Sequence, residues 1–144
     1  MMYLLDTNVV SELRKAATPR IDRHVRAWAK QADRGRLYLS VISILELEIG
    51  IRQLERRDRE QAAVLRHWLE QHVLTAFAGR ILPVDLAVAQ RCAALHVPDP
   101  SSERDALIAA TALVHGMTIV TRHEEDFRRT GVVMLNPWHS LPPG

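Results

Sequence analysis

The sequence predicts an α/β fold: one domain, residues 1–144, in which helices cover both faces of a central parallel sheet of about five strands, giving three layers, α/β/α. Three observations support this prediction. Short apolar runs of strand length alternate with longer segments of helical periodicity. Strands separated by helices favour parallel pairing. A chain of 144 residues that is 47% apolar and 25% charged is typical of a single soluble domain with a buried core.

The expected strands are short apolar runs. They cover residues 2–5, 37–39, 81–84, 117–120 and 132–135. The first run is continuously apolar, which is typical of a strand buried on both faces. Pro83 cannot donate a hydrogen bond to a ladder, so residues 81–84 are expected at an edge of the sheet.

Helical spacing and capping residues place the helices between these strands. Asn8 is a good N-cap for a first helix that carries Val9 and Val10. A long amphipathic helix is expected over residues 60–76, where apolar residues repeat every three or four positions. The remaining helices are expected from Val25 towards Gly35, after a cap at Ser40 or Ser43, over residues 86–96, and over residues 105–115 before Gly116.

Composition leaves the partner of the protein open. Nineteen Lys and Arg residues against seventeen Asp and Glu residues give a net charge of +2, too small a margin to indicate a nucleic-acid partner. Cys92 is the only cysteine, so no disulfide framework is possible. The longest apolar stretch, residues 106–114, is too short to span a membrane. We therefore expect a cytoplasmic protein with no membrane contact.

Asp6 is the first candidate for a functional acid. It directly follows the first strand, and the carboxyl ends of parallel strands are where open α/β sheets place their sites. The alternative is that Asp6 only caps the turn into the first helix.

Two further acids lie where packing does not require them. Glu46 shares a helical face with Ile42 and Ile49, and a charge on a buried face needs a partner. The alternatives are a salt bridge to an arginine or an escape of the carboxylate to water. Asp105 opens a helix, and Ser102 three residues earlier makes a near capping box, so capping is its alternative role.

Together the three acids can converge at one edge of a parallel sheet. Carboxylates about 5 Å apart would repel by roughly 3 kcal/mol per pair at an effective dielectric near 20, so protons or a hard cation must neutralise them. Oxygen ligands suit Mg²⁺ or Mn²⁺, which also bind phosphate oxygens. The chemistry indicated is metal-assisted phosphodiester hydrolysis.

Five segments in register carry a family resemblance. They are residues 4–12 (LLDTNVVSE), 40–47 (SVISILEL), 105–112 (DALIAATA), 120–122 and 135–139. The chain resembles PIN-domain proteins, specifically the VapC and FitB-like toxins of type II toxin–antitoxin modules. The resemblance implies a PIN-like fold, Mg²⁺-dependent endoribonuclease activity, and neutralisation by a small cognate antitoxin that occludes the site.

The resemblance also implies roles for individual residues. Its invariant acids match Asp6, Glu46 and Asp105, as catalytic residues and metal ligands, and its small polar residues that orient these acids match Thr7, Asn8, Ser43 and Thr121. A fourth acid is often found two residues after the threonine matched by Thr121, where this chain has His123. The fourth role is lost, taken by His123 through water, or moved to Asp126. An imidazole ligand would shift the metal preference from Mg²⁺ towards Mn²⁺.

An RNA substrate would need cations near the acids. Candidates for phosphate contacts are Arg14, Lys15, Arg52 and Arg122, although each is also explained as a solvated surface charge. Trp28 and Trp68 lie on apolar stripes and are expected in the core or an interface. The apolar surface around Trp28 and on residues 60–76, together with the pairing seen in PIN toxins, predicts a homodimer.

Two other functions are compatible with parts of the sequence. A haloacid-dehalogenase-type phosphatase needs a second aspartate two residues after the first, and this chain has Asn8 there, which argues against that class. A non-catalytic PIN-like interaction protein, which only pairs with itself and an antitoxin, remains the alternative.

Overall fold

The computed structural model describes residues 1–139, so the last five residues of the predicted domain lie outside it. Its centre is a five-stranded sheet with the order β3-β2-β1-β4-β5, in which every neighbouring pair is parallel. The strands are β1 (Tyr3–Leu5), β2 (Leu37–Ser40), β3 (Ile81–Leu82), β4 (Thr118–Val120) and β5 (Met134–Leu135). The predicted α/β class and parallel sheet are confirmed, and β3 lies at an edge as Pro83 indicated.

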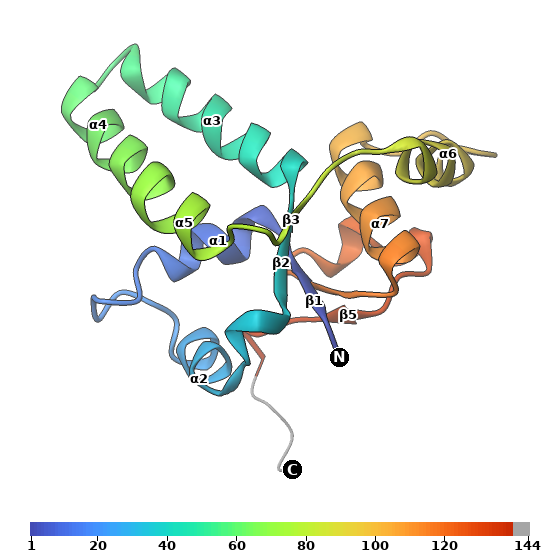
Figure 1. Cartoon of the computed structure of the whole chain (residues 1–144), viewed down its shortest axis with the longest axis horizontal. Helices are drawn as coiled ribbons and strands as arrows, with labels where there is room; N and C mark the ends of the chain where they lie inside the picture. The colour runs from blue at the N-terminus through green and yellow to red at the C-terminus, as the bar shows by residue number, and fades with distance from the viewer. Residues whose placement is uncertain (140–144) are drawn as a thin grey trace.

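Within residues 1–139, seven α-helices pack around the sheet. They are α1 (Thr7–Leu13), α2 (Arg23–Gln31), α3 (Val41–Glu55), α4 (Arg59–Trp68), α5 (Leu74–Ala76), α6 (Leu86–Leu95) and α7 (Glu103–His115). Short 3₁₀ turns add η1 (Arg34–Arg36), η3 (Glu124–Asp126) and η4 (Arg128–Thr130). Figure 1 shows α3 and α4 as a long pair on one side and α6 with α7 on the other.

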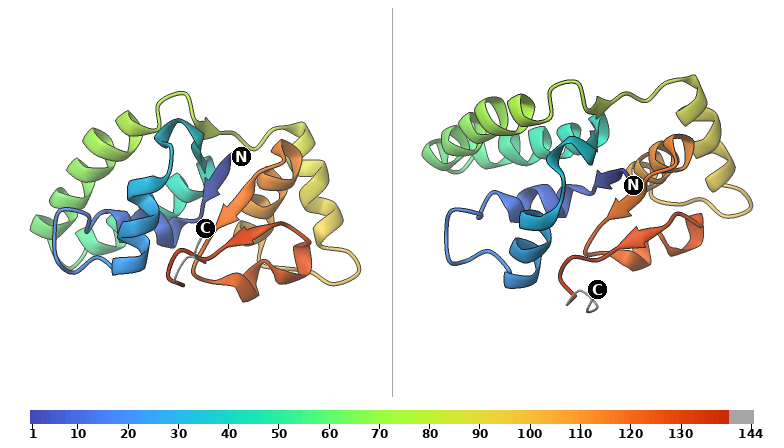
Figure 2. Two further views of the ribbon diagram at one scale, coloured as in Figure 1. Left: turned by 90° about the horizontal axis from the view of Figure 1, so that it is seen from below. Right: turned by 60° about the horizontal axis from the view of Figure 1, so that its bottom comes forward.

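Alternating strand residues supply two apolar clusters, one on each face. Leu5 and Val120 face the cluster that packs against α1 to α4, whereas Leu4 and Ile119 face the cluster that packs against α7. All four side chains are fully buried. The two views in Figure 2 show the same separation of the helices by the sheet, so the expected three layers are present.

Three details of the helices differ from the sequence predictions. Asp6, and not Asn8, is the N-cap of α1, because its carboxylate accepts the Thr7 N–H. The expected helix over residues 60–76 is interrupted by a π-helical turn, η2 (Leu69–Val73), which turns Leu69 and Val73 into the core. The helix expected up to Gly35 ends at Gln31 and is followed by η1.

Trp28 is 3% exposed and meets Tyr3 edge to face. It therefore belongs to the core and offers no surface to a partner.

No helix within residues 1–139 combines the length and hydropathy needed to cross a membrane.

Candidate functional site

Asp6 lies at the carboxyl end of the central strand β1 and is only 6% exposed. Its Oδ1 accepts the backbone N–H of Thr7 at 2.8 Å, and its Oδ2 accepts the Asn8 amide at 2.9 Å and the Thr121 hydroxyl at 2.8 Å. Burial raises the pKa of Asp6, as does the nearby charge of Glu46, while these hydrogen bonds lower it; the net shift is upward. A carboxylate has about four acceptor positions, so one remains open.

Thr121 and Asn8 join β1 to the loop after β4. The Thr121 hydroxyl accepts the N–H of His123 at 2.9 Å, and the Asn8 side-chain oxygen accepts the N–H of Arg122 at 3.1 Å. Both residues thereby tie the Asp6 carboxylate to a segment more than a hundred residues away in the chain. They occupy the orienting positions that the family resemblance implied.

Glu46 comes to the site from the second turn of α3. Its Oε1 accepts the Thr7 hydroxyl at 2.7 Å, and the Ser43 hydroxyl lies 3.0 Å from the same Thr7 oxygen. Since Thr7 has one hydroxyl proton, Ser43 donates to Thr7 while Thr7 donates to Glu46. The chain of contacts links Glu46 to the start of α1, directly beside Asp6.

The predicted apolar surroundings of Glu46 are wrong in part. Ile49 is 37% exposed and Gly50 is exposed, so the helix face that carries Glu46 is open to solvent. The Glu46 side chain is 27% exposed, and its Oε2 lies 3.7 Å from the Arg104 guanidinium. The salt bridge weighed as an alternative for Glu46 therefore exists, with Arg104 as the partner.

Asp105 projects from the first turn of α7. Its pKa is raised to about 6: burial has the largest effect, the charges of Asp126, Asp6 and Glu46 also raise it, in that order, and a hydrogen bond from Ser102 lowers it. Ser102 is the N-cap of α7 but makes no side-chain capping bond, so the near capping box predicted from the sequence does not form. The three predicted acids act on one another, and Asp126 belongs to the same electrostatic group.

For the role of the fourth acid, the structure favours Asp126 over His123. Of the three charges that act on Asp105, that of Asp126 has the largest effect. The His123 side chain is exposed, and His123 makes its hydrogen bonds through its backbone, donating to Thr121 at 2.9 Å and accepting from the Asp126 N–H at 3.1 Å. Asp126 ends the short turn η3, which follows His123.

The residues fit a hydrated hard cation. Within residues 1–139 no group of three His, Cys, Asp or Glu side chains is arranged to hold a metal ion on its own. Both Glu46 oxygens are engaged, by Thr7 and by Arg104, whereas Asp6 keeps an open acceptor position. Mg²⁺ is usually bound through one or two carboxylates with waters and substrate phosphates completing its shell, and Asp6 with Asp105 or Asp126 can supply those carboxylates.

The predicted RNA-binding cations do not gather at these acids. Of the four cations, Arg122 is the one linked to the acid site, because its backbone N–H donates to Asn8, which in turn binds Asp6. Its guanidinium lies 5.2 Å from the centre of the Trp138 ring. Lys15 pairs with Glu12 at 3.0 Å, and Arg52 lies in the last turn of α3. Sequence reasoning missed Arg104, although a cation in the first turn of a helix, where the dipole disfavours it, was a signal.

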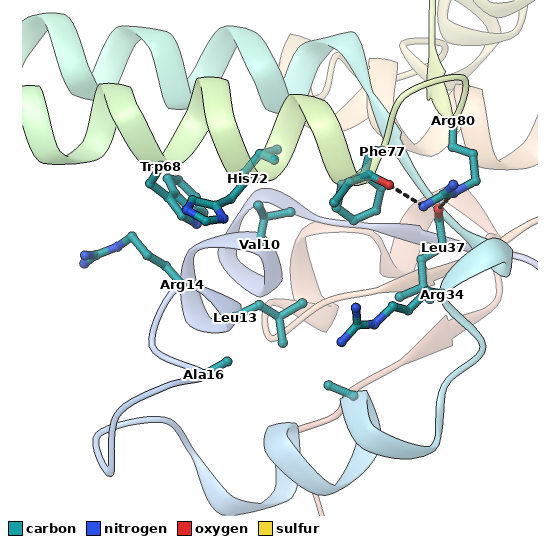
Figure 3. A pocket seen from close by; sticks show the side chains of 13 residues that line it. Val10, Leu13, Arg14, Ala16, Arg34, Leu37, Trp68, His72, Phe77 and Arg80 are labelled. Carbon is teal, nitrogen blue, oxygen red and sulfur yellow. Dashed lines mark hydrogen bonds between the residues drawn. The ribbon is translucent and has the colours of Figure 1, made fainter.

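A separate groove opens beside α1, on the side facing α4 and α5. It has a volume of about 480 Å³. In Figure 3, Trp68, His72 and Phe77 project into the groove from above, and Val10 and Leu13 of α1 line its opposite side. Arg14 and Arg34 lie at its rim. Arg14 is therefore placed at this groove and not at the acids.

Comparison with known families gives one match that covers most of the chain. The family model described as PIN domain matches residues 3–133.

Two full-length relatives agree with this match. The chain is 39% identical over 142 residues to the VapC ribonuclease Y4jK of Sinorhizobium fredii (strain NBRC 101917 / NGR234), covering 95% of this chain and 98% of that protein. It is 38% identical over 144 residues to the toxin FitB of Neisseria gonorrhoeae (strain ATCC 700825 / FA 1090), covering 96% and 99%.

Solved structures agree as well. The crystal structure of FitAcB from Neisseria gonorrhoeae superposes with a TM-score of 0.85 at 38% identity, over 96% of this chain and 99% of that one. The structure of FitAB bound to an IR36 DNA fragment superposes with a TM-score of 0.86 at 36% identity, over 98% and 99%.

Proposed function

This chain belongs to the PIN-domain family of toxin–antitoxin nucleases, and on that premise we propose that it is a Mg²⁺- or Mn²⁺-dependent endoribonuclease, the toxin of a type II pair. The observation that carries the proposal is the mutual influence of four acids from distant segments. Burial together with the charges of Asp126, Asp6 and Glu46 raises the pKa of Asp105 to about 6. A divalent cation bound among these acids would stabilise them, because its positive charge offsets the repulsion between the carboxylates.

The residues divide into acids and groups that hold them. Asp6 and Asp105, with Asp126, would bind the metal, which when bound lowers the pKa of water and neutralises charge on the phosphate. Asn8 and Thr121 fix one oxygen of Asp6 by hydrogen bonds of 2.9 and 2.8 Å. Thr7 fixes Glu46 at 2.7 Å, so the carboxylate that faces the site loses little freedom when substrate arrives.

RNA cleavage by the purified chain tests the proposal. We expect cleavage of structured RNA with Mg²⁺ or Mn²⁺, none with EDTA, and none from Asp105→Asn, whose side chain keeps nearly the same shape but cannot carry the charge. A chain that binds antitoxin but leaves RNA intact with either metal would support the non-catalytic alternative.

An antitoxin is the proposed protein partner. The structural relatives include FitAcB and FitAB, and the second of these was solved bound to a DNA fragment. The groove in Figure 3 supplies a surface of suitable chemistry, since its apolar floor with Arg14 and Arg34 at the rim suits a segment with apolar anchors and acidic neighbours.

We also infer a homodimer, on a basis that differs in part from the sequence prediction. Trp28 is buried, whereas residues 60–76 do carry exposed apolar side chains, Val64 at 55% and Leu74 at 36%. The helix α3 adds Leu45 and Ile49, which are 46% and 37% exposed and lie four residues apart. Light scattering of the isolated chain should give the dimer mass, and Leu45→Glu should give the monomer mass.

A cytoplasmic location follows from the proposed RNA substrate.

A further inference from the structure

Arg104 is the cation that the described residues place against the acid site. Its guanidinium lies 3.7 Å from Glu46 Oε2, which is within ion-pair range but beyond hydrogen-bond distance. The Arg104 side chain is 49% exposed, so it can move away from Glu46 without crossing packed side chains. The contact is therefore loose and exchangeable.

Local structure does not explain a cation at this position. Arg104 lies in the first turn of α7, where the positive end of the helix dipole disfavours a second positive charge. The first turn also contains Glu103 and Asp105, which the dipole does favour. The electrostatic attraction that offsets this unfavourable interaction with the dipole comes from outside the helix, from the carboxylate of Glu46.

The pairing also occupies an acceptor that the site would need. Glu46 Oε1 accepts a hydrogen bond from Thr7 at 2.7 Å, whereas Oε2 is held only by the ion pair with Arg104. As long as the pair exists, Glu46 is partly neutralised and withdrawn from any cation near Asp6 and Asp105. A cation bound there and the guanidinium of Arg104 would compete for the same carboxylate.

We propose that Arg104 is a positioning residue that exchanges partners, pairing with Glu46 in the metal-free protein and with a phosphate of the RNA backbone when metal and substrate are bound. The proposal rests on the proposed function and deepens it. Release from Arg104 would leave Glu46 Oε2 able to help hold a hydrated cation, and the planar guanidinium would offer two parallel N–H donors to a phosphate.

The test uses the full chain with Arg104→Gln and Arg104→Lys, and Arg36→Gln as the matched control. Arg36 is also a half-exposed arginine paired with an acid, Asp33 at 3.6 Å, and it lies in η1, before the amino end of β2, away from the acids. Calorimetry measures the affinity for Mn²⁺ and Mg²⁺ without RNA, and steady-state kinetics separate KM from kcat.

Arg104→Gln should tighten metal binding by about threefold, the size expected for loss of one half-exposed ion pair. It should raise KM for RNA by about tenfold while kcat changes little, because a charged hydrogen bond to phosphate is lost. Arg104→Lys should restore the parental metal affinity but only part of the KM, since an ammonium group lacks the planar pair of donors. Arg36→Gln should match the parent in both measurements.

Two results overturn the inference. Metal affinity and KM that are both unchanged in Arg104→Gln would show that Arg104 has no exchanging role. Weaker metal binding in that variant would show that Arg104 only holds Glu46 in place. A parent chain that neither binds metal nor cleaves RNA is a different outcome, because it removes the proposed function and this inference with it.

Discussion

At the scale of single residues, the acids of the site differ in what they do for the fold. Asp6 is nearly buried, caps α1 and accepts three hydrogen bonds. Asp105 is half-buried, gives α7 no capping bond, and is surrounded by acids. Removing one or the other should therefore change stability in opposite directions.

Asp105→Asn should stabilise the metal-free protein at neutral pH. The pKa of Asp105 is raised from 3.8 to about 6, so below 3.8 the carboxyl is protonated in both the folded and the unfolded state and has no effect on the free energy of unfolding. Between these values the folded state binds more protons, so stability falls as pH rises, and above about 6 the loss is complete. Thermal melts in EDTA should show Tm raised by about 3 °C at roughly pH 7.5 and unchanged near pH 4.

Asp6→Ala is the contrasting variant. It removes the N-cap of α1 and leaves Asn8 and Thr121 without their common acceptor, so Tm should fall by several degrees, and should do so even at the lower pH. If both variants lowered Tm equally, the charge repulsion assigned to Asp105 would be wrong.

The fourth acid is decided by comparing Asp126→Asn with His123→Ala. Asp126→Asn should lower the pKa of Asp105, because the charge of Asp126 is its strongest charged influence, and should weaken Mn²⁺ binding. His123→Ala should leave both unchanged, since the backbone N–H of His123 makes its contact with Thr121. Titration of the Asp105 carboxyl carbon by NMR reports the pKa. The reverse pattern would return the fourth role to His123.

At the scale of elements, α3 positions half of the site. Its N-cap is Ser40, which is fully buried and whose hydroxyl accepts the Ile42 N–H at 3.0 Å. Further along α3, the Glu48 carboxylate accepts two bonds from Arg66 of α4, at 2.8 and 2.7 Å. The first turns, which carry Ser43 and Glu46, are therefore fixed by a cap and the rest of the helix by its neighbour.

Ser40→Ala and Ser102→Ala make the same substitution at two N-cap positions. Ser40→Ala should cost about 1 kcal/mol, or roughly 3 °C in Tm, because a formed cap is lost. Ser102→Ala should cost clearly less, because Ser102 makes no capping bond to α7. Melts in EDTA, at a pH where Asp105 is protonated, compare the two, and an equal loss of Tm would contradict the assignment.

At the scale of the whole molecule, α1 connects the acids with the groove. Thr7 at its start bonds to Glu46, and Leu13 at its end lines the groove with Trp68. Catalysis and antitoxin capture can thus depend on different parts of the same helix, and the two can be separated by substitution.

Ala16→Glu should weaken antitoxin binding while leaving RNA cleavage unchanged. Ala16 is exposed and lines the groove, so an acidic side chain there opposes an acidic partner without disturbing the core. Ala17→Glu, the exposed neighbour, is the control for the added charge. Affinity for the cognate antitoxin is measured by calorimetry, and equal affinities for the two variants would remove the groove as the binding surface.

The sequence predicted the α/β class, the parallel sheet and the edge position of β3, because strand and helix periodicities are local. It also indicated Asp6 at a strand end, because its position follows from β1 alone. It could not show that Glu46 would face Arg104, since that contact depends on how α3 and α7 pack. It likewise missed the π-helical turn η2, because core packing of Leu69 and Val73 overrides helical spacing there.

The order of the strands has a consequence for synthesis of the protein. β1 is made first yet lies in the centre of the sheet, and its neighbour β4 and the tethering Thr121 are made only near the end of the chain. A growing polypeptide therefore lacks Asp105, Asp126 and the hydrogen bond from Thr121 to Asp6 until the segment that carries these residues has been made. A ribosome that has made only the residues before Asp105 therefore carries an incomplete acid site, whatever the state of the strands already made.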